Sequence, residues 1–387
     1  MKITRIITQV VNAQLRNWIF VRVETDTPGL YGIGEATLEF QTRAVMGALE
    51  DLGQLVIGED PRNIEHLWQV MYRHPFFKGG VVTMTALSGI DQALHDLKAK
   101  DLGIPLWQLL GGLSRKRLRM YDHLGGGSSD SVYNSADASA FAEKAAQSRA
   151  DGFTAVKILA VPRTAPLDGL AALKEAETLM AAARQGAGDD VDIMVDLHGR
   201  TTAAMAIQYA KVLEPFRPFF LEEPCQPEDY EGIARVARST SIPIAAGERL
   251  VHRREFLPLL QAQGISVAQP DVCHAGGLTE TRRIAALCDT FGVSMAPHNP
   301  LGPVATMVNI HLGFATPNFL IQEVMRADVP WRDEVVSGVV PIVDGHVTPP
   351  QAPGIGVEIN FEVAAKYPPV YVRPVQWYHE DGSVADW

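Results

Sequence analysis

Residues 191–224 read VDIMVDLHGRTTAAMAIQYAKVLEPFRPFFLEEP. Two apolar runs, at residues 193–195 and 219–221, end in acidic residues and enclose an Ala-rich stretch with helical spacing. Short apolar runs that alternate with helices of 10 to 15 residues are typical of parallel βα units. The runs are apolar on both faces, as expected for strands that are covered by helices on each side. The stretch therefore predicts a parallel α/β fold.

The same alternation extends from residue 118 to about residue 335, but the two ends of the chain differ. The opening third has β-rich runs at residues 18–25 and 30–37, followed by a helical pattern over residues 43–112. This order predicts an α+β unit with an antiparallel meander. The final residues, 341–387, are rich in Pro and Gly, and we expect them to return to the first unit. A chain of 387 residues suits two domains or one large barrel with additions.

The net charge of −11 argues against nucleic acid as a partner, because phosphate binding needs clustered Lys and Arg. An acidic protein with an anionic substrate must supply positive charge locally, for example through a bound cation. The three cysteines, Cys225, Cys273 and Cys288, form no CxxC motif, which favours a reducing compartment such as the cytoplasm. The sequence has no run of 18 or more apolar residues, so we expect no membrane span. The N-terminus resembles a strand and not a signal peptide.

Acidic and histidine residues follow successive predicted strands at intervals of 23 to 27 residues, about one βα unit each. These residues are Asp196, Glu222, Glu248, Asp271, His298 and Glu323. In a (β/α)₈-type barrel the carboxyl ends of the strands converge on one face, where catalytic groups lie. The spacing predicts that the six side chains surround one site.

The first three acids, Asp196, Glu222 and Glu248, admit two interpretations. Any one of them could cap the helix that follows, since helix N-termini attract carboxylates. Three carboxylates at one barrel mouth, however, would repel one another unless a cation compensates. A hard, oxygen-binding cation indicates Mg²⁺, with Mn²⁺ as the alternative. No Cys-His cluster suggests zinc.

These residues resemble the enolase superfamily, and specifically its mandelate racemase subgroup. The resemblance covers the whole chain and includes SGIDQALHDLKAK at residues 88–100. It implies a (β/α)₇β modified TIM barrel with an α+β capping domain. The expected boundaries are a capping domain at residues 1–115, the barrel at residues 116–335, and a C-terminal segment at residues 336–387 that returns to the cap.

The resemblance also implies roles for the six residues. In the subgroup, the acidic residues that bind the metal lie at the ends of the third, fourth and fifth barrel strands. At these positions this chain has Asp196, Glu222 and Glu248. Asp271 and His298 match the Asp-His dyad of the sixth and seventh strands, and Glu323 matches the acid of the eighth. His298 is the candidate base that removes the proton α to a carboxylate, and Asp271 would orient its ring.

His198 is the candidate general acid. It lies two residues after Asp196, so a strand that continued this far would point both side chains to the same side. The alternative is that the strand has ended by Leu197 and that His198 belongs to a loop.

Lys157 marks a departure from the racemases of the subgroup. Those enzymes carry Lys-x-Lys at the end of the second barrel strand, whereas this chain has Lys157, Ile158 and Leu159. Without the second lysine a racemase with two bases is disfavoured. Lys157 could contact the substrate carboxylate or pair with an acid at a strand end.

Further substrate contacts are expected from the cap, whose loops close over barrel mouths of this kind. The candidates are Arg16 and Trp18 in the first hairpin, and Phe77 and Lys78 in HPFFKGG. Each could instead be an ordinary surface or interdomain residue.

The sequence as a whole predicts a hydro-lyase, a carbon–oxygen lyase that dehydrates an acid sugar. DLHGR at residues 196–200 and APHNPLGP at residues 296–303 resemble the D-galactonate dehydratase branch, which makes an anionic aldonic acid the expected substrate. Alternatives are gluconate, arabinonate or a similar acid, and an epimerase or cycloisomerase of the same superfamily. A barrel metallohydrolase and a non-catalytic sugar-acid binder are the alternatives outside it. The family resemblance implies a homo-oligomer.

Overall fold

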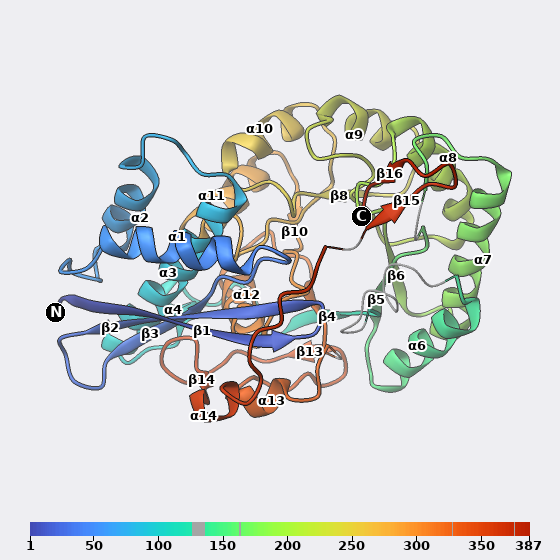
Figure 1. Ribbon diagram of the computed structural model, residues 1–387. Helices are drawn as coiled ribbons and strands as arrows, with labels where there is room; N and C mark the ends of the chain where they lie inside the picture. Colours follow the sequence, from blue (N-terminus) through green and yellow to red (C-terminus); the bar gives the residue numbers. More distant parts are fainter. Residues whose placement is uncertain (126–135, 162–163, 327, 375) are drawn as a thin grey trace.

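The computed structural model describes residues 1–387 except 126–135, 162–163, 327 and 375. Its described part has an N-terminal sheet with helices, a curved parallel sheet with outer helices, and a C-terminal segment that runs between them (Figure 1). This arrangement confirms the predicted modified TIM barrel with a capping unit.

The capping unit is an antiparallel meander of three strands packed against helices, as the sequence predicts. A Cβ on Gly32 would lie 1.9 Å from the carbonyl oxygen of Ala93, so only glycine lets α3 pack directly on β3. The elements are β1 (Ile3–Ala13), β2 (Arg16–Thr25), β3 (Tyr31–Glu35), α1 (Thr42–Gln54), α2 (Ile64–Arg73), α3 (Val81–Asp101) and α4 (Leu106–Leu109).

In the described part of the chain, eight parallel strands form the barrel, with β11 beside β4 at one end of the hydrogen-bonded order and β10 at the other. A parallel bridge between Met295 and Phe319 links β10 to the segment before β11 and closes the ring. The strands are β4 (Leu118–His123), β5 (Ala155–Ile158), β6 (Asp192–Asp196), β7 (Leu221–Glu222), β8 (Ile244–Ala246), β9 (Val267–Ala268), β10 (Ser294–Met295) and β11 (Gln322–Val324).

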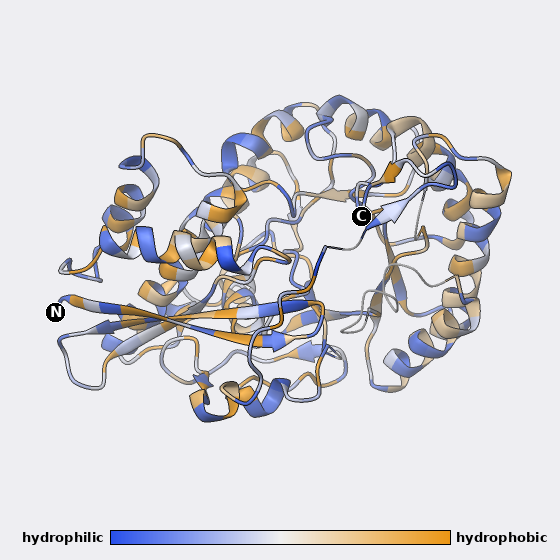
Figure 2. Cartoon of the chain, viewed as in Figure 1, coloured by the Kyte–Doolittle hydropathy of each residue, from blue (hydrophilic) through white to orange (hydrophobic). Residues whose placement is uncertain are grey.

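Helices lie between consecutive strands, as βα units require, and they show mixed hydrophilic and hydrophobic residues along their length (Figure 2). They are α6 (Ala138–Ala150), α7 (Leu170–Ala187), α8 (Ala203–Leu213) with the 3₁₀ turn η1 (Glu214–Phe216), α9 (Tyr230–Ala237), α10 (Arg253–Gln261), α11 (Gly277–Thr290) and α12 (Pro303–Ala315). Among the described residues, no helix is both long enough and apolar enough to span a membrane.

The C-terminal segment returns to the cap, as expected, but its residues His346 and Val347 pair antiparallel with the barrel strand β4. Leu106 donates to the carbonyl of Gly354 at 2.8 Å, and the side chain of Asn17 bonds the backbone of Val370 in both directions. The short helix α13 (Arg332–Val335) ends the barrel region directly before this segment. The elements of the segment are β12 (Val336–Ser337), β13 (His346–Val347), β14 (Glu358–Ile359), α14 (Phe361–Ala364), β15 (Trp377–Tyr378) and β16 (Val384–Ala385).

The last hairpin, β15–β16, departs from that expectation because it reaches the carboxyl ends of the barrel strands. Its buried residues Trp377 and Ala385 join Leu15 of the cap and Leu159 of the barrel in a small apolar cluster. The guanidinium of Arg200 stacks over the Trp377 ring at 4.4 Å. The hairpin therefore contacts both units.

Glu35 joins the cap to the barrel. Its fully buried carboxylate accepts hydrogen bonds of 2.8 Å from the backbone N–H groups of Gly302 and Ala305, at the start of α12. Replacement by Leu leaves both donors unsatisfied, so we expect the free energy of unfolding to fall by roughly 2–4 kcal/mol. Thermal denaturation measures the effect. The matched control, Glu24→Leu, removes two partly exposed ion pairs, with Arg5 and with Arg22, and should cost less than about 1 kcal/mol. An equal loss in both variants would contradict the joining role.

Candidate active site

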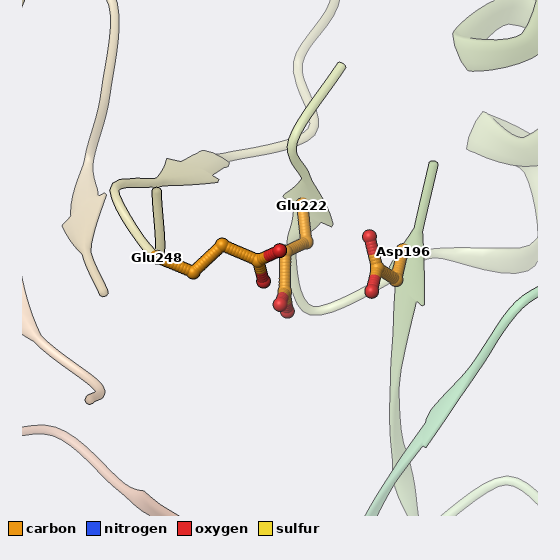
Figure 3. Close-up of side chains that lie close together, drawn as sticks. All are labelled: Asp196, Glu222 and Glu248. Atoms are coloured by element: carbon orange, nitrogen blue, oxygen red, sulfur yellow. The ribbon is translucent and has the colours of Figure 1, made fainter. Parts of the chain in front are cut away.

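Three carboxylates meet at the carboxyl ends of β6, β7 and β8. Asp196 and Glu222 end neighbouring strands and are paired in register, and Glu248 follows β8 by two residues. One oxygen atom from each residue lies within 4.8 Å of the other two. Figure 3 shows the three side chains pointing toward one another. The structure therefore brings together the three acids that the sequence predicts as metal ligands.

The loop that presents Glu248 is held by its neighbours. Gly247 has φ +132°, and a Cβ there would lie 2.6 Å from the Phe256 ring, so only glycine fits. Glu223 accepts from the backbone N–H of Gly247 at 2.8 Å and pairs with Arg249 at 2.7 Å. These bonds fix the carboxyl ends of β7 and β8, the fourth and fifth barrel strands, relative to each other.

The donor set fits a divalent cation. Glu222 Oε2 is buried and accepts no hydrogen bond from any described residue, and neither does Glu248 Oε2. Burial, together with repulsion from Asp196, raises the pKa of Glu248 to about 7 and also raises that of Glu222. Carboxylate oxygens buried without donors carry a large desolvation cost, which a bound cation would offset. Asp196, Glu222 and Glu248 could hold such an ion.

Lys157 pairs with acids at the strand ends, which is one of the two roles considered for it, and its contact with a substrate carboxylate stays a prediction. Its fully buried Nζ lies 2.7 Å from Glu222 Oε1, 2.7 Å from Glu323 Oε1 and 3.9 Å from Asp196 Oδ2. Burial lowers its pKa, but the surrounding carboxylates outweigh burial and raise the pKa well above its usual value. Lys157 is thus a fixed positive charge within the acidic cluster.

His298 lies between Asp271 and the acidic cluster. Its Nδ1 is 2.8 Å from Asp271 Oδ2, and its Nε2 is 3.4 Å from Glu248 Oε2. Asp271 is fully buried and its pKa is lowered, because His274 and His298 outweigh the effect of burial. The predicted dyad is therefore formed, with the ring oriented so that Nε2 faces the carboxylates.

Burial lowers the pKa of His298, but Glu248 and Asp271 outweigh it and raise the pKa to about 10. Glu248 is the largest of the raising contributions. Neutralisation of Glu248 by a cation would remove much of this effect and favour the neutral ring, which can accept a proton.

Glu323 supports the loop that carries His298. Its Oε2 accepts a 2.7 Å hydrogen bond from the backbone N–H of Asn299, and its Oε1 pairs with Lys157. Burial raises the pKa of Glu323, but Lys157 and His298 outweigh it, so the net shift is downward. The eighth-strand acid is therefore held close to the candidate base.

The strand argument for His198 was wrong. β6 ends at Asp196, and His198 lies in a loop with φ +56°, so its direction does not follow the strand period. Its backbone N–H donates to Asp196 Oδ1 at 2.6 Å, which closes a tight turn. Its Nδ1 is 2.6 Å from the carbonyl oxygen of Trp387, and the rings of the two residues meet edge to face. The alternative placement in a loop is correct.

The two cap residues from the first hairpin are buried. Arg16 donates to the carbonyl of Pro300 and pairs with Glu39 at 3.0 Å, so it holds the loop after His298. Trp18 has no exposed surface and packs in the core near Phe20, because β2 turns its side chain inward. The structure places Trp18 in the core instead of at a substrate-contacting surface.

Phe77 and Lys78 are in the loop between α2 and α3, apart from the cluster. Phe77 is 87% exposed, and Lys78 donates to the carbonyls of Arg73 and Pro75 at 3.0 Å. The ammonium of Lys78 lies over the Tyr72 ring, which stacks on His252 in the β8–α10 loop. Their contact with a substrate stays a prediction.

His123 is a candidate that the sequence reasoning missed. It ends β4 in register with Lys157, so both side chains point to the same side of the sheet. Its Nδ1 accepts from the backbone N–H of Gly125, and burial lowers its pKa to about 3. The neutral ring therefore carries its proton on Nε2. The signal was present: His123 ends the run LRMYDH, one unit before Lys157.

Comparison with known proteins agrees with this geometry. Residues 140–363 match the family described as enolase C-terminal domain-like, and residues 4–111 match the mandelate racemase / muconate lactonizing enzyme N-terminal domain. The chain thus belongs to the enolase superfamily, in the mandelate racemase / muconate lactonizing enzyme group.

The chain is also similar over its full length to dehydratases. It is 40% identical to a D-galactonate dehydratase from Xanthomonas oryzae pv. oryzae and to one from Ralstonia nicotianae, with 100% of each chain covered. It shares 30% identity and a TM-score of 0.89 with an enolase from Agrobacterium radiobacter whose structure contains sodium and L-malate, with 100% of both chains covered. The chain is an enzyme and, within this superfamily, a carbon–oxygen lyase.

Proposed function

We propose that this enzyme dehydrates an aldonic acid, D-galactonate first among the candidates, to a 2-keto-3-deoxy acid. The observation that carries the proposal is the pairing of His298 with Asp271. Nε2 of His298 faces the site where three carboxylates converge. The full-length relatives named D-galactonate dehydratase favour this substrate, and the L-malate in the Agrobacterium structure is a small hydroxy acid of related chemistry.

The first half of the reaction removes the proton α to the substrate carboxylate. His298 accepts this proton at Nε2, and Asp271 holds the ring and stabilises the imidazolium that forms. A Mg²⁺ ion held by Asp196, Glu222 and Glu248 would supply electrostatic stabilisation for the negative charge that develops on the substrate carboxylate. Lys157 holds Glu222 and Glu323 in place.

The second half expels the 3-hydroxyl group, which needs a general acid. We assign this role to His198. Its Nδ1 donates to the Trp387 carbonyl, so Nε2 is the ring nitrogen that would deliver a proton from the protonated ring. Burial lowers the pKa of His198 well below its usual value, so the protonated ring would be a strong acid. Leu159, which replaces a second lysine, is buried in the apolar cluster with Trp377 and offers no alternative base. The chemistry therefore has one base and one acid, which suits dehydration better than racemisation.

Incubation with a set of C5 and C6 aldonic and aldaric acids tests the proposed function. Formation of a keto acid from D-galactonate is the expected result. In D₂O, α-deuterium exchange without any keto acid would instead identify an epimerase. Keto acid formation from gluconate or arabinonate but not from galactonate would retain the dehydratase and replace the substrate.

Metal removal is expected to destabilise the protein. Metal-free protein should gain about 2.7 kcal/mol of stability at a Mg²⁺ concentration of 100 times Kd, measured as a rise in Tm, and should recover activity. Glu222→Gln should abolish the rise, whereas Glu175→Gln, at an exposed position on α7, should leave it unchanged. Stoichiometric zinc in the purified protein, with no response to Mg²⁺ or Mn²⁺, would contradict the assignment.

The remaining expectations concern location and assembly. All three cysteines are buried and free, which supports a location in the cytoplasm. A homo-oligomer stays a prediction, and light scattering of the purified protein would test it.

A further inference from the structure

A large cleft lies outside the barrel, between the cap helices α2 and α3 and the barrel helix α11. Figure 1 shows these helices as neighbours on the cap side of the barrel. The cleft has a volume of about 910 Å³, and none of its lining residues belongs to the candidate active site. Its lining includes the apolar residues Ile64, Leu109, Leu110 and Ala286, and the other lining residues are polar or charged.

The walls of the cleft are positively charged, although the chain carries a net charge of −11. Arg62, Lys98, Arg282 and Arg283 line it, and among the described lining residues Glu65 is the one carboxylate. Arg283 pairs with Glu65 and with Glu280, so these charges are compensated. Arg62 is likewise paired with Asp60 at 2.7 Å, so the positive charge of the cleft comes from Lys98 and Arg282.

Lys98 and Arg282 have no carboxylate partner among the described residues. Lys98 donates to the carbonyl of Arg62 at 3.1 Å, and Arg282 donates to the carbonyl of Leu110 at 3.0 Å. Burial lowers the pKa of Arg282, and no carboxylate counters this effect. Two cations without a carboxylate partner line the same cleft, one from the cap and one from the barrel, and this is an electrostatic arrangement that an anion would complete.

The N-terminus of α2 adds to the positive potential. Asn63, Ile64 and Glu65 line the cleft, and Asn63 forms no capping hydrogen bond through its side chain. The first N–H groups of a helix carry a partial positive charge and bind anions when no side chain satisfies them. This contribution acts on the same space as Lys98 and Arg282.

We propose that this cleft binds a small polyanion with two or more phosphate or carboxylate groups, held between Lys98 of the cap and Arg282 of the barrel. The lining residues that the structure describes include no Phe, Tyr or Trp on which a nucleobase would stack, which favours a compact polyanion over a nucleotide. Because the ligand would bridge the two units, its binding should also stabilise their association. The proposal does not depend on the proposed reaction.

Calorimetric titration of metal-free protein with pyrophosphate and with citrate, at constant ionic strength, tests the proposal. We expect saturable binding of at least one of them, at one site per chain, and a rise in Tm with its concentration. The double variant Lys98→Gln/Arg282→Gln should weaken that binding about tenfold or more, since two charge-assisted hydrogen bonds are lost. The better-bound probe identifies phosphate or carboxylate as the preferred group.

The matched control is Lys174→Gln/Arg235→Gln, which removes the same charge from exposed positions on α7 and α9. It should change the affinity less than about twofold. An equal loss in the control would show that net charge alone attracts the anion, and absence of saturable binding in the unmodified protein would also overturn the proposal.

If the double variant does not fold, the single variants Lys98→Gln and Arg282→Gln replace it, and each should weaken binding. A change of oligomeric state in the cleft variants, without anion binding by the unmodified protein, would identify the cleft as a subunit interface instead.

Discussion

Replacement of His298 by Asn is expected to lower kcat by about 10³–10⁴-fold, because it removes the group that accepts the α-proton. Asn can still bond Asp271, so the fold and the acidic cluster should persist, and the Mg²⁺-induced rise in Tm should be retained. Exchange of the α-proton in D₂O, followed by NMR, should be lost together with keto acid formation. Loss of dehydration with exchange intact would move the base to another residue.

His274→Asn is the matched control, since both histidines contact the same carboxylate. His274 Nδ1 lies 3.6 Å from Asp271 Oδ2, but its Nε2 bonds the carbonyl of Thr37 in the cap at 3.0 Å. The ring therefore joins the cap to the barrel. We expect His274→Asn to lower kcat less than about tenfold and to lower Tm. A loss of activity equal to that of His298→Asn would contradict the division of roles.

The parts of this site that follow strand ends were predictable from the sequence. A parallel barrel needs apolar strands at nearly regular intervals, so Asp196, Glu222 and Glu248 could be placed on one face by counting alone. The same reasoning placed Asp271 beside His298, although their atomic contact at 2.8 Å depends on two loops.

The parts that depend on loops and on distant segments could not be predicted in this way. His198 takes a left-handed conformation immediately after β6, where the strand period no longer applies. Its partner Trp387 is 189 residues away, and no local pattern indicates such a contact. Trp18 lies near a hairpin loop in sequence, but the twist and packing of the cap sheet bury it. Tertiary packing, and not local propensity, decided these positions.

Lys157 shows how the same cluster constrains stability. Replacement by Met removes the ammonium that lies 2.7 Å from both Glu222 and Glu323, and it leaves these buried carboxylates without their cation. Breaking a buried ion pair from one side costs about 3–5 kcal/mol, so we expect a large fall in the Tm of the metal-free protein. Because the variant cluster is more negative, Mg²⁺ should raise its Tm by more than it raises that of the unmodified protein.

Lys100→Met separates this effect from the general cost of removing a lysine that is paired with a buried carboxylate. Lys100 lies 2.7 Å from the buried Asp96 in the cap, remote from the three converging carboxylates. Its removal should also lower Tm, but added Mg²⁺ should not recover the loss. An equal response of the two variants to Mg²⁺ would mean that the ion binds away from Glu222. The rise in Tm on adding Mg²⁺ could instead be smaller in Lys157→Met than in the unmodified protein. This result would mean that Lys157 holds the carboxylates in the geometry that binds the ion. It would also mean that the charge of Lys157 does not compete with the ion for these carboxylates.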